Sequence, residues 1–117
     1  MTYIPTTADI EWTRKAIEGK RAWTVPSAGS VLEFDHSTMV FTTFMKMNPN
    51  PPEIDLFERV CLNLAALGFR EEKRIMCEGA DTVDDILMNV FGLTEDDIEA
   101  TKIHSSRNRP HDPRFDD

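Results

Sequence analysis

The stretch from Ala22 to Phe44, Ala-Trp-Thr-Val-Pro-Ser-Ala-Gly-Ser-Val-Leu-Glu-Phe-Asp-His-Ser-Thr-Met-Val-Phe-Thr-Thr-Phe, decides the fold of this chain. β-Branched and aromatic residues fill three short runs in it, and the segments Pro26–Gly29 and Asp35–Ser37 separate these runs. Three strands joined by short turns give this pattern, so we expect a small antiparallel meander. Helical patterns flank the stretch on both sides, and the predicted class is therefore α+β.

The predicted strands cover residues 21–25, 30–35 and 38–44. Alternation within the second strand places Leu32 and Phe34 on one face, and Glu33 and Asp35 on the other. The third strand carries apolar residues on both of its faces. We therefore expect either helices on both sides of the sheet or one sheet face in contact with a second subunit.

Local signals predict a helix on each side of the meander. Thr6, with Asp9 three residues later, is typical of the capped start of a helix over 7–18 that ends at Gly19. Its expected buried stripe contains Ile10, Trp12, Thr13, Ala16 and Ile17.

The second helix has the clearest start in the sequence. Asn50 is placed to cap it, Pro51 suits its first position, and Glu53 stands at its third. The helix is expected to end before Gly68 and to bury Ile54, Phe57, Val60, Cys61, Leu64 and Leu67.

The segment 70–78 has two interpretations, because its charged half favours a helix while its alternating apolar residues favour a fourth strand. We favour the strand. Thr82 with Asp85, and Thr94 with Asp97, predict capped helices over 83–91 and 95–103. The predicted fold is an antiparallel sheet of three or four strands with three to four helices packed on it, in the order α-β-β-β-α-(β)-α-α.

The length of 117 residues predicts a single α+β domain over 1–103, followed by a mobile polar C-terminal tail over 104–117. No run of apolar residues has the length that crosses a membrane, and the N-terminus does not resemble a secretory signal. We therefore expect a cytoplasmic protein in which Cys61 and Cys77 remain reduced.

The net charge of −8 is concentrated in one segment. Residues 78–101 hold eight acidic side chains and no Lys or Arg. An acidic surface repels phosphate backbones and anionic lipid, which argues against direct nucleic-acid or membrane binding and favours a basic protein partner.

Glu33, Asp35 and His36 form the densest polar set near the sheet, and a carboxylate beside an imidazole could perform acid–base chemistry. All three are also ordinary residues for a strand end and a turn, and this is the interpretation we favour. His36 is expected to project from the opposite face to Glu33 and Asp35 if the strand continues through it.

Other candidate groups have a simpler structural explanation. Cys77 is expected in the core rather than as a nucleophile. The tail residues His104, His111 and Asp112 are not expected to form a preformed metal site. An aromatic set is expected in the core rather than around a ligand pocket; it contains Tyr3, Trp12, Trp23, Phe34, Phe41 and Phe44. We predict no cofactor, no metal and no catalytic residue.

The leading hypothesis is a non-catalytic interaction module that binds a basic protein partner or self-associates. Its expected partner-binding residues are Asp81, Asp84, Asp85, Glu95, Asp96, Asp97 and Glu99. One alternative is a small enzyme with a site near Glu33, Asp35 and His36. Another is an inhibitor that mimics nucleic acid, although carboxylates at helix starts fit capping better than a copy of phosphate spacing.

Overall fold

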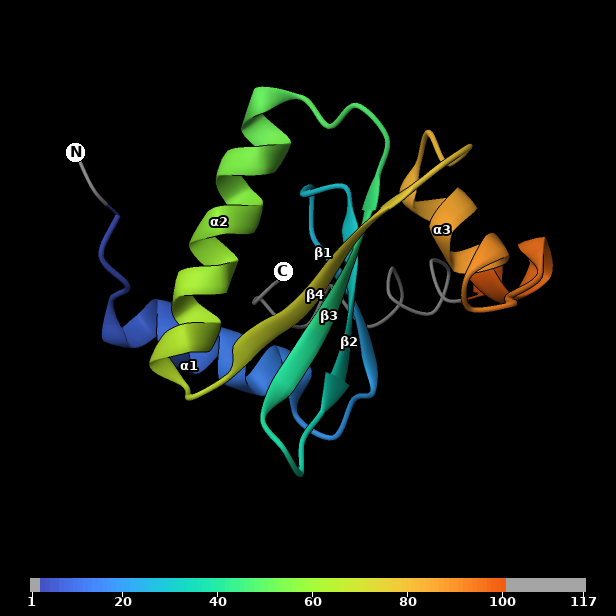
Figure 1. Cartoon of the computed structure of the whole chain (residues 1–117). Coiled ribbons are helices and arrows are strands. Elements are labelled where there is room, and N and C mark those ends of the chain that lie inside the picture. The colour runs from blue at the N-terminus through green and yellow to red at the C-terminus, as the bar shows by residue number, and fades with distance from the viewer. Residues whose placement is uncertain (1–2, 101–117) are drawn as a thin grey trace. The chain divides into compact units, whose positions relative to one another are not determined.

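The computed structural model describes residues 3–100, and these fall into two compact units divided between Ile86 and Leu87. Figure 1 shows the elements, which are α1 (Thr7–Ile17), β1 (Ala22–Val25), β2 (Ser30–Asp35), β3 (Val40–Lys46), α2 (Pro51–Ala66), β4 (Arg70–Cys77) and α3 (Val83–Asn89). A further helix begins at Glu95 and continues to Ala100, the last described residue. The predicted α+β class and element order are confirmed.

The sheet has the strand order β1-β2-β3-β4, and it is mixed rather than antiparallel. β1, β2 and β3 form the predicted meander, but β4 pairs with β3 in parallel. The reason is the connection: α2 carries the chain back along β3, so that β4 starts where β3 starts and runs in the same direction. The segment 70–78 is therefore a strand, as we favoured, and the expectation of an antiparallel sheet is wrong for this strand.

The turn between β2 and β3 is longer than the sequence suggested. Met39 has a positive φ of 60°, and its backbone N–H donates to the carbonyl oxygen of Asp35. The turn thus includes Thr38 and Met39, and β3 begins at Val40 instead of Thr38.

The main core lies between the sheet and the helices α1 and α2. Trp23 pairs with Leu32, and Phe34 pairs with Phe41, so their side chains share the face that packs on Phe57 of α2. Figure 1 shows α2 lying along this face of the sheet. The opposite face also has buried side chains, those of Val31, Val40 and Phe44.

The predicted start of α2 is confirmed in detail. The side chain of Asn50 accepts from the backbone N–H of Glu53, and the carboxylate of Glu53 accepts from the backbone N–H of Asn50. This reciprocal pair satisfies two donors that the helix leaves without an internal partner. Lys46 Nζ lies 3.0 Å from Glu53 Oε2, which ties the end of β3 to the first turn of α2.

A polar contact joins α1 to α2 beneath the N-terminal segment. Asn63 is buried, and its Nδ2 donates to Thr13 Oγ1 over 3.1 Å while its Oδ1 lies 2.9 Å from the hydroxyl of Tyr3. The same hydroxyl lies 2.8 Å from Asp9 Oδ2. Burial and the bond to Asp9 raise the pKa of Tyr3, so the phenol stays protonated and able to donate.

Two residues of the predicted stripes are more exposed than expected. Trp12 is 51% exposed and contacts Trp23 edge-on, with ring centroids 5.9 Å apart. Ile54 is 39% exposed. The single domain over 1–103 stays a prediction, and the tail over 104–117 lies outside the described residues.

Candidate functional site

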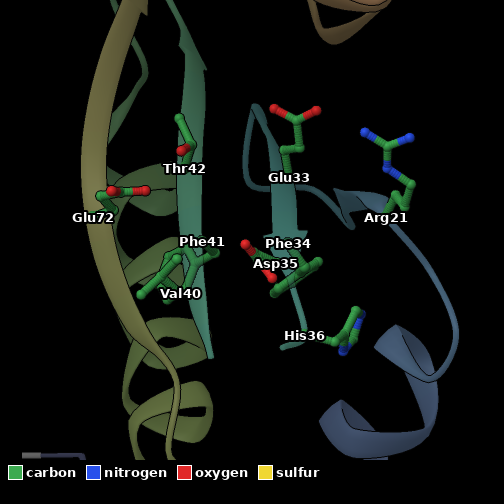
Figure 2. A pocket seen from close by; sticks show the side chains of 9 residues that line it. All are labelled: Arg21, Glu33, Phe34, Asp35, His36, Val40, Phe41, Thr42 and Glu72. Carbon is green, nitrogen blue, oxygen red and sulfur yellow. The ribbon is translucent and has the colours of Figure 1, made fainter. Parts of the chain in front are cut away.

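A pocket of about 460 Å³ opens on the face of the sheet opposite α1 and α2 (Figure 2). Its wall and floor are formed by Arg21, Glu33, Phe34, Asp35, His36, Val40, Phe41, Thr42 and Glu72. The volume lies in the range of small-ligand sites. Three carboxylates and one guanidinium give the lining a charge of −2 when the imidazole is neutral.

Strand register explains why Glu33 and Thr42 line the pocket. The two residues are paired across β2 and β3, and each alternates with residues of the main core. Their side chains therefore share the opposite face. Two residues along from this pair, Asp35 of β2 is paired with Val40 of β3. Val40 therefore lies on the same face and forms part of the pocket floor.

Glu72 reaches the pocket through an irregularity in β4. Phe41 pairs with Glu71 and Thr42 pairs with Lys73, so Glu72 is an extra residue between two ladder positions. Such a β-bulge redirects the side chains around it. Figure 2 shows the carboxylate of Glu72 extending from β4 toward Thr42.

Asp35 is held by the turn that follows β2. Its Oδ1 accepts from Ser37 Oγ at 2.6 Å, from the backbone N–H of Ser37 at 3.0 Å and from that of Thr38 at 3.3 Å. These bonds, above all the one from the Ser37 hydroxyl, lower the pKa of Asp35. The carboxylate therefore remains charged at neutral pH. The hydrogen-bond donors that stabilise this charge come from the turn and not from a ligand.

His36 closes one side of the pocket from the same turn. Its Nε2 lies 2.7 Å from the carbonyl oxygen of Lys20, so Nε2 carries a proton and donates to it. The ring also packs on Phe34 and Phe69, with centroid distances of 5.7 and 5.6 Å. Nδ1 remains as an acceptor when the ring is neutral.

The structure thus brings together the three residues that the sequence singled out, Glu33, Asp35 and His36. As expected, the His36 ring lies on the opposite face to Glu33 and Asp35, because it packs on Phe34 and Phe69 of the helix-side core. Sequence reasoning missed Arg21 and Glu72. Arg21 stands just before β1, and Glu72 sits in a run of charged residues without readable alternation.

A second cavity of about 290 Å³ lies next to His36, between the end of α1 and the end of α2. Its lining is mainly apolar and includes Ile17, Met39, Leu67 and Phe69. His36 borders both cavities.

The predicted partner-binding acids divide between the two units. In the first unit, Asp85 Oδ2 accepts from the backbone N–H groups of Asp81 and Thr82, and the N–H of Asp85 donates to Thr82 Oγ1. In the second unit, Thr94 and Asp97 form the same reciprocal pair, and the bond from the Thr94 backbone lowers the pKa of Asp97. Both predicted capping pairs are confirmed.

The other predicted partner-binding acids do not accept these capping hydrogen bonds. Asp81, Glu95, Asp96 and Glu99 are exposed, and Asp84 is half-buried. Among residues 3–100, no three His, Cys, Asp or Glu side chains are arranged to hold a metal ion. The histidines and Asp112 of the tail lie outside the described residues.

Both cysteines are free thiols, and the predicted disulfide-free state is what the structure has. Burial raises the pKa of Cys61 to about 12 and also raises the pKa of Cys77. A thiol in this state is a poor nucleophile. Cys77 is also buried at the end of β4, as the sequence predicted for a core residue.

Within the part of the chain that the structure describes, none of the helices has the length and apolar character needed to span a membrane. Comparison of the chain with protein-family models, with curated proteins and with solved structures gives no match.

Proposed function

We propose that this chain is a protein-interaction module, without catalytic activity of its own, that binds a basic segment of a protein partner. The observation that carries the proposal is the convergence of Glu33, Asp35 and Glu72 on one pocket of the sheet. Carboxylates from two strands, β2 and β4, are thereby presented around a concave surface, which suits a cationic group.

The charge of the whole chain supports the same choice. A net charge of −8 creates a negative field that accelerates encounter with a basic surface and disfavours phosphate backbones. The exposed acids Asp81, Glu95, Asp96 and Glu99 add to this field in their own units. The proposal places the protein in the cytoplasm, where its two free thiols stay reduced.

The contacts of Asp35 and His36 favour binding over catalysis. Asp35 is engaged by three donors of its own turn, and the Nε2 of His36 is engaged by the Lys20 carbonyl. Both side chains therefore shape and charge the pocket without a direct carboxylate–imidazole pair between them. A general base must be able to exchange a proton with a substrate, and the hydrogen bonds that these two side chains already make hinder this exchange.

Fluorescence anisotropy tests the proposal with a labelled octapeptide of alternating Arg and Gly. We expect saturable binding at low salt and release at about 0.5 M NaCl, where exposed charges are screened. A Gln-Gly octapeptide is the neutral control. Failure of the basic peptide to bind, or binding that salt leaves unchanged, would contradict the proposal.

Two further arms of this experiment separate the other hypotheses. If the chain mimics nucleic acid, it would displace duplex DNA from a DNA-binding protein at stoichiometric amounts, whereas a module for short basic segments would not. If it self-associates, light scattering at rising concentration would give twice the mass of 13.4 kDa.

A second candidate function, a small acid–base enzyme, is favoured by one observation: Glu33, Asp35 and His36 do line the same pocket. A panel of chromogenic esters, phosphate esters and glycosides tests it. Turnover that is lost in His36→Ala and in Glu33→Gln would establish catalysis. We expect no turnover above the rate of buffer alone.

A further inference from the structure

The geometry points to one occupant of the pocket: a single arginine side chain of the partner, with its guanidinium held between Glu33 and Glu72. This inference rests on the proposed function and adds to it the place and the chemistry of recognition. It also assigns a role to Glu72, which the sequence did not single out.

The two carboxylates belong to residues on either side of Thr42. Glu33 stands on β2 and Glu72 on β4, so β3 alone separates them. Neighbouring strands are about 4.8 Å apart, which places their backbones about 10 Å apart. This separation leaves space for one planar cation between the two side chains, and Thr42, on the strand between them, adds a hydroxyl as a further acceptor.

Both carboxylates are available to a ligand. Among residues 3–100, neither the side chain of Glu33 nor that of Glu72 has a hydrogen bond or an ion pair, in contrast to the side chain of Asp35. Glu33 is half-buried, so its charge is less well hydrated than that of a fully exposed group. A cation that pairs with Glu33 replaces the missing water contacts with a charge-assisted hydrogen bond.

The pocket combines an apolar floor with a charged rim. Val40 forms the floor, on the same face of the sheet as the carboxylates. A long basic side chain matches this arrangement, because its methylene stem covers apolar surface while its head stays at the rim. Arginine fits better than lysine, since its fork of N–H donors can serve two carboxylates and a hydroxyl at once.

Arg21 limits the pocket to one cation. It stands on the β1 side, across the pocket from Glu72 in Figure 2. Its guanidinium repels a second basic group of the partner. Removal of this charge should therefore strengthen the binding of the octapeptide, an effect that loss of folding cannot produce.

The test measures the dissociation constant of the Arg-Gly octapeptide for matched variants. The double variant Glu33→Gln/Glu72→Gln removes two charges from the pocket, and Asp55→Asn/Glu58→Gln removes two exposed charges from α2, on the other side of the sheet. We expect binding at least about tenfold weaker for the pocket variant and no more than about twofold weaker for the α2 variant. Arg21→Gln should bind about two- to fivefold tighter.

A Lys-Gly octapeptide of the same charge tests the choice of arginine, and we expect the wild-type chain to bind it at least about fivefold more weakly than the Arg-Gly peptide. Equal affinity for the two peptides would overturn this choice. Equal weakening by the two double variants would overturn the site while the proposed function stands. If neither peptide binds the wild-type chain, the proposed function fails, and the inference fails with it.

Discussion

Glu71 and Arg74 form an ion pair on one face of β4, with Glu71 Oε2 3.0 Å from Arg74 Nε. Residues three apart in a regular strand face opposite sides of the sheet. The β-bulge at Glu72 supplies the extra residue that brings the pair onto the side of α2, where Arg74 lies 4.8 Å from the ring centroid of Phe57. The same bulge turns Glu72 toward the pocket, so one irregularity shapes both faces of the sheet.

Arg74→Ala should lower the free energy of unfolding by about 1–2 kcal/mol. The largely exposed ion pair contributes less than about 1 kcal/mol of this, and the contact with the Phe57 ring contributes about 0.5–1 kcal/mol. Urea denaturation followed by circular dichroism measures the change. Arg70→Ala, at the exposed start of β4, is the control and should stay within about 0.5 kcal/mol of wild type. Equal losses for the two variants would contradict the role of the Phe57 contact.

Asn63→Ala should destabilise the fold by about 1–3 kcal/mol. Asn63 is 5% exposed and links Thr13 to Tyr3, so its truncation leaves a buried hydroxyl with one partner fewer. Leu62→Ala, at an exposed position one residue earlier on α2, is the comparison and should have a smaller effect. The two urea midpoints measure the difference. A larger loss for Leu62→Ala would rule out the proposed importance of the polar contact.

Gly29→Ala should be more destabilising than Gly19→Ala, although both glycines have a positive φ, of 66° and 71°. A Cβ at Gly29 would lie 3.2 Å from both Glu53 Oε2 and Lys46 Cε, whereas at Gly19 it would meet nothing within 4 Å. Both variants carry the backbone strain of about 1 kcal/mol or more. Only Gly29→Ala also displaces the Lys46–Glu53 ion pair, and thermal unfolding should show a lower midpoint for it than for Gly19→Ala. Equal midpoints would show that the ion pair moves aside freely.

Acid should destabilise the first unit through Glu53. The hydrogen bond from the Asn50 backbone lowers the pKa of Glu53 below its ordinary value of 4.5, and the Lys46 ammonium acts in the same direction. A carboxyl with a lowered pKa in the folded state contributes stability above pH 4.5, and this contribution disappears as the pH falls through the folded-state pKa. Urea midpoints between pH 6 and about pH 3 should therefore fall, and less steeply for Glu53→Gln. A Glu53→Gln profile parallel to that of wild type would exclude this contribution.

The thiols should react slowly in the native protein. Burial raises the pKa of Cys61 to about 12, so almost none of it is thiolate at pH 8, and Cys77 is buried at the end of β4. A disulfide reagent that releases a coloured thiolate should therefore titrate both groups slowly in buffer and within seconds to minutes in 6 M urea. Rapid reaction of either thiol in buffer would indicate that the surrounding structure opens readily.

Local signals predicted the helices of this chain, and non-local pairing limited the rest. Thr6, Asn50, Thr82 and Thr94 each act within three residues of sequence, and every one of them caps a helix as expected. The direction of β4 depends instead on where α2 returns the chain. No property of residues 70–78 taken alone distinguishes a parallel partner from an antiparallel one.

The pocket could be predicted only in part for the same reason. Glu33, Asp35 and His36 are neighbours in sequence, so their proximity was visible as a polar cluster. Glu72 joins them through pairing across two strands, and its orientation depends on a bulge within a run of polar residues. Such a run has no alternating apolar residues that define an inward face. A shift of the strand register by one residue therefore cannot be recognised in the sequence.

The charged run on β4 also bears on the solubility of the protein. β4 is an edge strand of the sheet, eight residues long, and its outer backbone groups could pair with a strand of another molecule. Arg70, Glu71, Glu72, Lys73 and Arg74 occupy more than half of its length. Charges on an edge strand hinder the growth of a sheet from molecule to molecule. Replacement of these charged residues by threonine or valine would therefore let the edge strand pair with other molecules and promote aggregation.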